Sequence, residues 1–156
     1  MNAKEYNKIV EQHSDSLFRF ALRYTADEED SNDAVQESFV ALWEHRDEVS
    51  PAGAKGWLMR VLYRLLVDRH RRVKRLDGLE ERVEEGYNPH HQYELHDQLQ
   101  QMLKQLPDIQ RTLLLLRDLE GYSYKEMAEM TGLSEQQVMT YLYRARVKAR
   151  KYLSNN

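Results

Sequence analysis

Residues 128–138 read AEMTGLSEQQV, and the spacing of small residues in this segment is typical of two helices that cross closely. Ala128 has a side chain small enough for a second helix to approach, and Gly132 allows the bend between the two helices. Val138, six residues after the glycine, is suited to fill the gap at the crossing. The segment therefore predicts a helix-turn-helix.

The second helix of this motif is predicted to begin with a capping box and to continue into a basic segment. Ser134 is suited to cap the helix, and the Gln137 side chain can accept a hydrogen bond from the Ser134 backbone N–H. The helix is expected to reach Tyr152, and its later turns carry Arg144, Arg146, Lys148, Arg150 and Lys151. A basic second helix has the geometry of a duplex-DNA reader, and a plain helical hairpin is the alternative.

Composition favours an all-α chain. The 156 residues include only six glycines and three prolines, and no segment alternates as a β-strand does. With no cysteine, the chain can form neither a disulfide framework nor a thiolate metal site, which fits a reducing cytoplasm. The longest leucine run, Leu113–Leu116, is too short for membrane insertion, and the polar N-terminus lacks a signal-peptide core. We therefore expect a cytoplasmic protein.

The net charge of −3 conceals segments of opposite sign. The net charge is −7 over residues 1–54, +7 over 55–75, −5 over 76–106 and +2 over 107–156. Affinity for polyanions is therefore concentrated in residues 55–75 and in the C-terminal helix. Because phosphate neutralisation scales with the cations that one face presents, we expect free DNA to bind weakly and a partner to hold the chain on its target.

Hydrophobic periodicity predicts four helices in the first half of the chain. They cover residues 4–13, residues 17–24, a stretch that follows Thr25 and ends near residue 46, and residues 54–75. Thr25 is expected to cap the third helix with Glu28 as its capping-box partner. That helix is expected to bury Val35, Phe39, Leu42 and Trp43. The chain then divides into lobes over 1–75 and 96–156, joined by a flexible acidic linker over 76–95.

Three segments together resemble one protein family. They are residues 33–39 (DAVQESF), residues 57–72 from Trp-Leu to Arg-Arg, and residues 106–146 from Leu-Pro to Arg-Ala-Arg. In this order and spacing they resemble the small extracytoplasmic-function (ECF) sigma factors of the bacterial sigma-70 family. The resemblance implies a region 2 helical bundle over 1–75, which binds core RNA polymerase and opens the −10 element. It implies a region 4 helix-turn-helix over 96–156, which reads the −35 duplex.

An acidic stripe is predicted on the third helix. Asp33, Gln36 and Glu37 have the i, i+3, i+4 spacing of one helix face, and taken alone they form a solvated surface. The resemblance implies instead that this face contacts the clamp helices of the largest polymerase subunit, where carboxylates meet arginines. Val40 is the expected apolar neighbour at that contact.

The helix over 54–75 combines cations with aromatic side chains, as single-strand binding requires. Its candidate −10 residues are Lys55, Trp57, Arg60, Tyr63, Arg64, Arg69, His70, Arg71 and Arg72. The resemblance implies that this helix and the loop over 49–56 open the −10 element, with one base extruded into a pocket of that loop. Trp57 is alternatively a core anchor. Relatives usually have Asn where Arg64 stands, so their base preference does not carry over, and Arg64 is alternatively a phosphate ligand.

The recognition helix is expected to turn Val138, Leu142 and Ala145 inward. The residues left for the major groove are Glu135, Gln136, Met139, Thr140 and Tyr143, with Arg144 and Arg146 on phosphates. Relatives commonly have Gly-Thr-Val where this chain has Gln136-Gln137-Val138. We therefore expect the recognition helix to keep its docking geometry on DNA but to recognise a different base sequence. Arg111 and Lys125 are expected to add contacts to the DNA backbone.

Catalysis and metal binding find little support. His90, His91 and His96 lie near Glu94 and Asp97 but lack a compact ligand motif, which indicates surface histidines rather than a metal site. The chain has no catalytic motif, so we expect no enzyme activity, no cofactor and no small-molecule substrate. The expected partners are core polymerase, promoter DNA and an anti-sigma factor. The alternatives are a helix-turn-helix regulator acting without polymerase, and a module that sequesters a partner without DNA.

Overall fold

A computed structural model describes residues 1–76 and 94–155, so most of the predicted acidic linker and His90 and His91 lie outside the described residues. Throughout the described part the chain is helical and contains no strand, which confirms the predicted all-α class. None of the helices found there is both long and apolar enough to cross a membrane.

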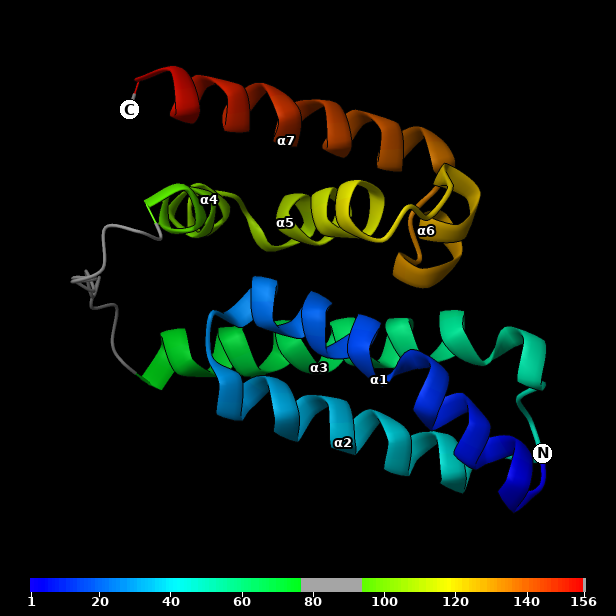
Figure 1. Ribbon diagram of the computed structural model, residues 1–156. Coiled ribbons are helices and arrows are strands. Elements are labelled where there is room, and N and C mark those ends of the chain that lie inside the picture. Colours follow the sequence, from blue (N-terminus) through cyan, green and yellow to red (C-terminus); the bar gives the residue numbers. More distant parts are fainter. Residues whose placement is uncertain (77–93, 156) are drawn as a thin grey trace.

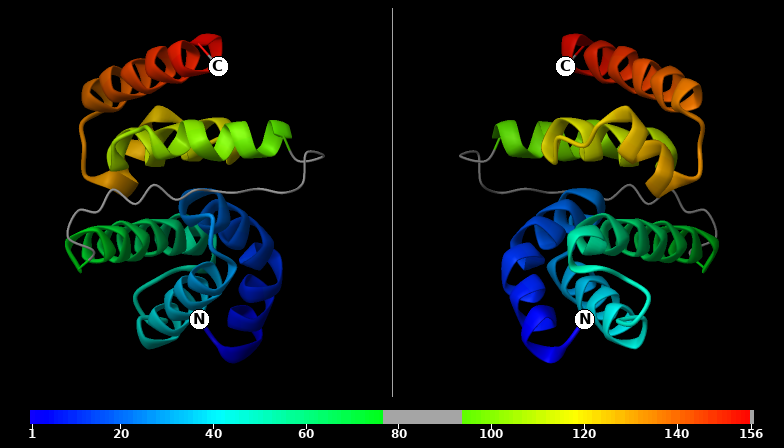
Figure 2. Two further views of the ribbon diagram at one scale, coloured as in Figure 1. Left: turned by 90° about the vertical axis from the view of Figure 1, so that its left-hand side faces the viewer. Right: turned by 90° about the vertical axis from the view of Figure 1, so that its right-hand side faces the viewer.

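The N-terminal lobe, residues 1–76, consists of α1 (Ala3–Thr25), α2 (Glu28–Glu44), the short 3₁₀ turn η1 (Pro51–Gly53) and α3 (Ala54–Leu76). The C-terminal lobe, residues 94–155, consists of α4 (Glu94–Lys104), α5 (Asp108–Leu114), the π-helical segment η3 (Leu115–Leu119), α6 (Tyr124–Thr131) and α7 (Glu135–Asn155). The C-terminal lobe lies as a second layer upon the first, with α6 packed on α3 and η3 packed on α1 (Figures 1 and 2).

Each lobe is organised around apolar side chains that face its own helices. In the N-terminal bundle, Phe20 of α1, Leu42 of α2 and Leu62 of α3 are completely buried. In the C-terminal lobe, Leu116 and Met127 are completely buried. Because both sets belong to one continuous cluster of buried residues, the two lobes share a core across their contact.

The helix-turn-helix is confirmed in its details. Gly132 ends α6 with a left-handed backbone (φ 79°), and its N–H donates to the Ala128 carbonyl over 2.9 Å. At the start of α7, the Gln137 N–H donates to the Ser134 hydroxyl (3.1 Å), and the Ser134 N–H donates to the Gln137 side chain (3.0 Å). The residues expected to face inward, Val138, Leu142 and Ala145, are buried.

The first two predicted helices form one continuous helix, α1, so the predicted interruption near residue 15 is wrong. Ser14 lies at that point and satisfies its hydroxyl inside the helix by donating to the Val10 carbonyl. A serine bonded in this way competes only weakly with helical structure. The helix ends instead at Ala26, which has a left-handed backbone (φ 56°).

The predicted cap of α2 at Thr25 is also wrong. Asp27 caps the helix, and its carboxylate accepts a hydrogen bond from the Asp30 N–H over 2.9 Å. The Thr25 hydroxyl instead donates to the Ala21 carbonyl at the end of α1. Because a carboxylate at this position also meets the positive end of the helix dipole, aspartate is the stronger cap here.

Trp43 was expected in the core but is 37% exposed. Its ring meets Tyr6 edge to face, with the centroids 5.0 Å apart, and the Arg46 guanidinium lies 4.0 Å from its centroid. Amphipathic neighbours therefore cover a ring that the bundle does not enclose.

Replacing Gly132 with alanine is expected to destabilise the chain by about 1 kcal/mol, because a Cβ is strained in the left-handed conformation. The thermal unfolding midpoint, followed by circular dichroism, should fall by about 2–4 °C. The control is Gly56→Ala within α3, where an added Cβ would meet only ordinary contacts and the midpoint should hold or rise. Equal midpoints for Gly132→Ala and the unmodified chain would contradict the argument.

Candidate polymerase and nucleic-acid interfaces

The predicted acidic stripe is present on the outer face of α2. Asp33, Gln36 and Glu37 are all exposed, and Val40, one turn further along, is 56% exposed. On the opposite side of the helix, Val35 and Phe39 pack into the bundle. The stripe therefore presents carboxylate, amide and apolar groups together on a rigid helix.

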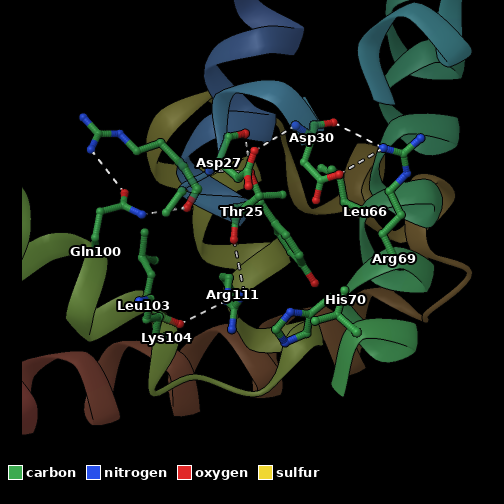
Figure 3. A pocket seen from close by; sticks show the side chains of 14 residues that line it. Thr25, Asp27, Asp30, Leu66, Arg69, His70, Gln100, Leu103, Lys104 and Arg111 are labelled. Atoms are coloured by element: carbon green, nitrogen blue, oxygen red, sulfur yellow. Dashed lines mark hydrogen bonds and ion pairs between the residues drawn. The ribbon is translucent and has the colours of Figure 1, made fainter. Parts of the chain in front are cut away.

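Glu37 is also part of an ion-pair network with α3. Its carboxylate lies 2.8 Å from Nη2 of Arg69. The Nη1 of Arg69 contacts the backbone carbonyl and the carboxylate of Asp30 at 3.3 Å and 3.4 Å (Figure 3). The structure thus holds Arg69, a candidate −10 residue, against α2. Asp33 and Gln36 are the other exposed polar groups of the stripe, and the network itself consists of Asp30, Glu37 and Arg69. A partner that contacts Asp33 and Gln36 can therefore bind without disturbing this network.

The start of α3 forms one wall of a cleft of about 480 Å³ between the lobes. Lys55, Trp57 and Arg60 line it from α3, and Tyr122, Glu126, Glu129 and Met130 line it from the C-terminal lobe. The Lys55 ammonium lies 5.4 Å from the centroid of the Tyr122 ring. Three of the candidate −10 residues therefore face the other lobe.

Trp57 combines the two roles considered from the sequence. The side chain is half-buried and packs against the core, with its ring centroid 5.5 Å from that of His45. It also lines the cleft between the lobes. An indole held firmly on one side and accessible on the other is suited to stack an unpaired base.

The second half of α3 carries the remaining candidate cations. Arg64 and Arg72 are exposed, and Tyr63 is half-buried. The His70 and Arg71 side chains each lie 3.6 Å from the carboxylate of Asp108, the first residue of α5. Burial and the nearby Arg111 lower the pKa of His70, and the Asp108 carboxylate opposes this shift.

The recognition helix α7 displays the predicted major-groove residues on one side. Glu135, Gln136, Met139, Tyr143 and Arg144 are exposed, and Thr140 is half-buried. Arg146 differs, because its Nη2 donates to the Asp118 carboxylate over 2.7 Å. That hydrogen bond raises the pKa of Arg146. A phosphate contact by this guanidinium would compete with Asp118.

Arg111 is not placed to contact DNA as the sequence suggested, because it is 4% exposed and lies where the lobes meet. Its Nε donates to the Leu103 carbonyl (3.0 Å), and its Nη1 donates to the Tyr24 carbonyl in the last turn of α1 (3.2 Å; Figure 3). Lys125 is exposed on α6, as the predicted contact of Lys125 with the DNA backbone requires.

Family models match both lobes. The model for sigma-70 region 2 matches residues 9–76, and the model for sigma-70 region 4 matches residues 96–148. The RNA polymerase sigma factor SigV of Bacillus subtilis is 30% identical over 141 residues, which cover 87% of this chain and 83% of SigV. The chain belongs to the sigma-70 family, in its extracytoplasmic-function group.

A second relative in this group is longer. The ECF RNA polymerase sigma factor SigE of Mycolicibacterium smegmatis is 31% identical over 160 residues, which cover 97% of this chain and 62% of SigE. The match thus spans less than two thirds of SigE.

Two solved structures share the fold of this sigma factor. CnrH, solved in complex with the cytosolic domain of CnrY, matches with a TM-score of 0.77 and 26% identity over 99% of this chain and 91% of CnrH. RpoE of Bartonella quintana, solved in complex with the anti-sigma factor NepR, matches with a TM-score of 0.79 and 22% identity over 97% of this chain and 98% of RpoE. Both matches cover region 2 and region 4 together.

Sequence reasoning did not find the residues that join the two regions of this sigma factor. Glu120 follows the π-helical segment, its side chain is 1% exposed, and its carboxylate contacts Arg19 of α1 at 3.0 and 3.2 Å. Asp108 meets α3. Each is an ordinary surface residue in its own helix pattern, so only the packing of the regions reveals its role.

Proposed function

We propose that this sigma factor binds core RNA polymerase through α2, reads the −35 duplex with α7 and opens the −10 element with α3. The proposal is supported by the separation of three candidate surfaces on the molecule. The acidic stripe lies on α2, the cationic surface on α3 and the major-groove residues on α7, and each helix is packed into a lobe. The proposal assigns residues 1–75 to region 2, 76–95 to the linker and 96–156 to region 4.

The α2 stripe is the proposed contact with the clamp helices of the largest polymerase subunit. Exposed carboxylates on a rigid helix match arginines of a partner through charge-assisted hydrogen bonds. Asp33 and Gln36 make the polar contacts, and the exposed Val40 adds an apolar contact beside them. Glu37 contributes its remaining acceptor capacity, because one of its carboxylate oxygens already contacts Arg69.

The α3 surface is proposed to favour melted DNA over duplex. Arg64 and Arg72 are exposed and neutralise backbone phosphates, while Trp57 and Tyr63 offer rings to unpaired bases. Unpaired bases are available only after the duplex opens, so binding energy realised on the open strand shifts the equilibrium toward opening. No bond is made or broken by this chain in that process, and polymer synthesis belongs to the polymerase.

The α7 surface is proposed to read the −35 duplex from the major groove. Gln136 can form a bidentate contact with adenine, Glu135 can accept from cytosine, and Met139 can contact a thymine methyl group. Arg144 is suited to a phosphate contact that positions the helix without specifying sequence. These assignments rest on the exposure of these side chains along the first turns of α7.

An anti-sigma factor is the proposed regulatory partner. RpoE of Bartonella quintana was solved with the anti-sigma factor NepR, and its chain shares the two-region fold over nearly its whole length. The protein is proposed to work in the cytoplasm, where polymerase and promoters are found.

A run-off transcription assay with purified core polymerase tests the proposal against its alternatives. Start sites that appear only when the chain is added support a sigma factor. Footprints on duplex DNA without polymerase, and no new start sites, would support a stand-alone regulator. Neither footprints nor new start sites would support sequestration of another protein.

Replacing Asp33 and Gln36 together with alanine is expected to raise the dissociation constant for core polymerase by about tenfold, because two polar contacts are lost. Glu37 is left intact so that the Arg69 network is preserved. The control is Glu11→Ala with Gln12→Ala, which removes the same pair of groups from exposed positions of α1. An affinity unchanged from the control would assign core binding to another surface.

Replacing Arg64 and Arg72 together with alanine is expected to lower permanganate reactivity of −10 thymines by about tenfold in the polymerase complex. Binding to the core should stay within about twofold, because neither residue lies on α2. The control is Lys4→Ala with Lys8→Ala, which removes two exposed cations from α1. Full reactivity in the arginine variant would show that α3 does not hold the open strand through these cations.

A further inference from the structure

We propose that a cavity beside Arg111 is a binding site for a small phosphate monoester, a phosphorylated sugar or polyol. The cavity has a volume of about 270 Å³ and is lined by residues of α1, α2 and α3 and of α4 and α5 (Figure 3). It is distinct from the cleft at the start of α3, and of the candidate −10 residues only Arg69 and His70 line it. The inference goes beyond the proposed function and does not depend on it.

Charged side chains give the cavity an excess of positive charge. Apart from His70, its lining has four cationic residues and two carboxylates, namely Arg23, Arg69, Lys104 and Arg111 against Asp27 and Asp30. A hollow with an excess of one sign of charge attracts ions of the opposite sign. The lining therefore favours an anionic ligand.

Arg111 is the buried cation of this set, with 4% of its surface exposed. Within the described part of the chain, its guanidinium donates to carbonyl oxygens alone, at 3.0 Å to Leu103, 3.2 Å to Tyr24 and 3.5 Å to Leu106. A guanidinium has five N–H donors, so two of them remain for a ligand. Because a buried charge is costly without an opposite charge, a bound anion would supply the charge balance that carbonyl dipoles provide only in part.

The cavity has a cationic side and an acidic side. In Figure 3, Lys104 and Arg111 lie below and Asp27 and Asp30 lie above. The Asp30 carboxylate is paired with Arg69 at 3.4 Å, and the Asp27 carboxylate uses one oxygen to cap α2. The cationic side is suited to a phosphate, and the second oxygen of Asp27 is suited to accept from a hydroxyl of the same ligand.

The volume of the cavity limits the size of the ligand. A space of about 270 Å³ holds about nine water molecules, and it is smaller than the roughly 300 Å³ at which pockets for drug-sized ligands begin. Leu66, Val73 and Leu103 line it with apolar groups that suit a short carbon skeleton. A phosphorylated sugar or polyol combines the phosphate, the hydroxyl donors and the small size, whereas a nucleotide adds a base that exceeds this volume.

Calorimetric titration of the full chain tests the site, with ribose 5-phosphate and inorganic phosphate as the two probes. We expect ribose 5-phosphate to bind at one site, about tenfold more tightly than inorganic phosphate, because only the sugar carries hydroxyl groups for Asp27. The ligand contacts both lobes, so at ten times its dissociation constant it should raise the thermal unfolding midpoint by about 3–6 °C. Absence of saturable binding at millimolar concentrations would overturn the proposal.

Substitutions at two exposed positions of the lining make the result specific, and they leave the buried Arg111 intact. Lys104→Ala should weaken the binding of both probes by about tenfold, because each loses a charge-assisted contact. Asp27→Asn preserves the cap of α2, since asparagine caps about as well as aspartate. It should weaken ribose 5-phosphate by about fivefold while inorganic phosphate binds as before or more tightly, because a repelling carboxylate is removed.

Lys8→Ala is the matched control, because Lys8 is an exposed lysine of α1 that does not line the cavity. This variant should bind both probes as the unmodified chain does. Three results would overturn the proposal: equal affinities of the two probes for the unmodified chain, equal affinities of Lys104→Ala and Lys8→Ala, or equal weakening of both probes by Asp27→Asn.

Discussion

The guanidinium of Arg111 sits where three parts of the molecule end. It donates to Leu103 at the end of α4, to Leu106 in the following loop and to Tyr24 in the last turn of α1. Carbonyl groups at helix ends lack intrahelical partners, and a cation satisfies them while meeting the negative end of the helix dipole. This one buried side chain therefore fixes the start of the C-terminal lobe and its position upon the N-terminal lobe.

The segment that follows Arg111 brings further charged groups to the same contact. The π-helical turn η3 ends at Leu119, and the Glu120 N–H donates to the Leu115 carbonyl across five residues. Glu120 and Tyr122 leave this turn toward α1 and α3, where they meet Arg19 and Lys55. Wide turns of this kind commonly occur at functional positions, and here the turn directs two side chains toward the other lobe.

Local sequence patterns predicted the helix-turn-helix and the long cationic helix because each depends on neighbours in the chain. Gly132, Ser134 and Gln137 define their turn and cap almost without help from the rest of the protein. The break expected near Ser14 is wrong because the Ser14 hydroxyl donates to the Val10 carbonyl within the helix. The cap expected at Thr25 is wrong because the Asp27 carboxylate accepts the hydrogen bond from the Asp30 N–H instead.

The exposed site residues could be named from helical spacing, since a face that is not buried is available to a partner. Their surroundings could not be named in this way. Nothing near Arg69 in the sequence indicates that Asp30 and Glu37 will surround it, and Arg111 lies 87 residues from the carbonyl of Tyr24 that it meets. Such contacts depend on how whole helices pack, and no periodic pattern encodes that.

The ion pair between Arg19 and Glu120 has a consequence for descent. One partner sits in a helix of the first lobe and the other in a turn of the second, 101 residues apart. Loss of the carboxylate would leave the half-exposed Arg19 guanidinium without this contact to the second lobe, and selection would then favour a change at position 19. Among descendants of a common ancestor, we expect these two sites to change together, although they belong to different lobes.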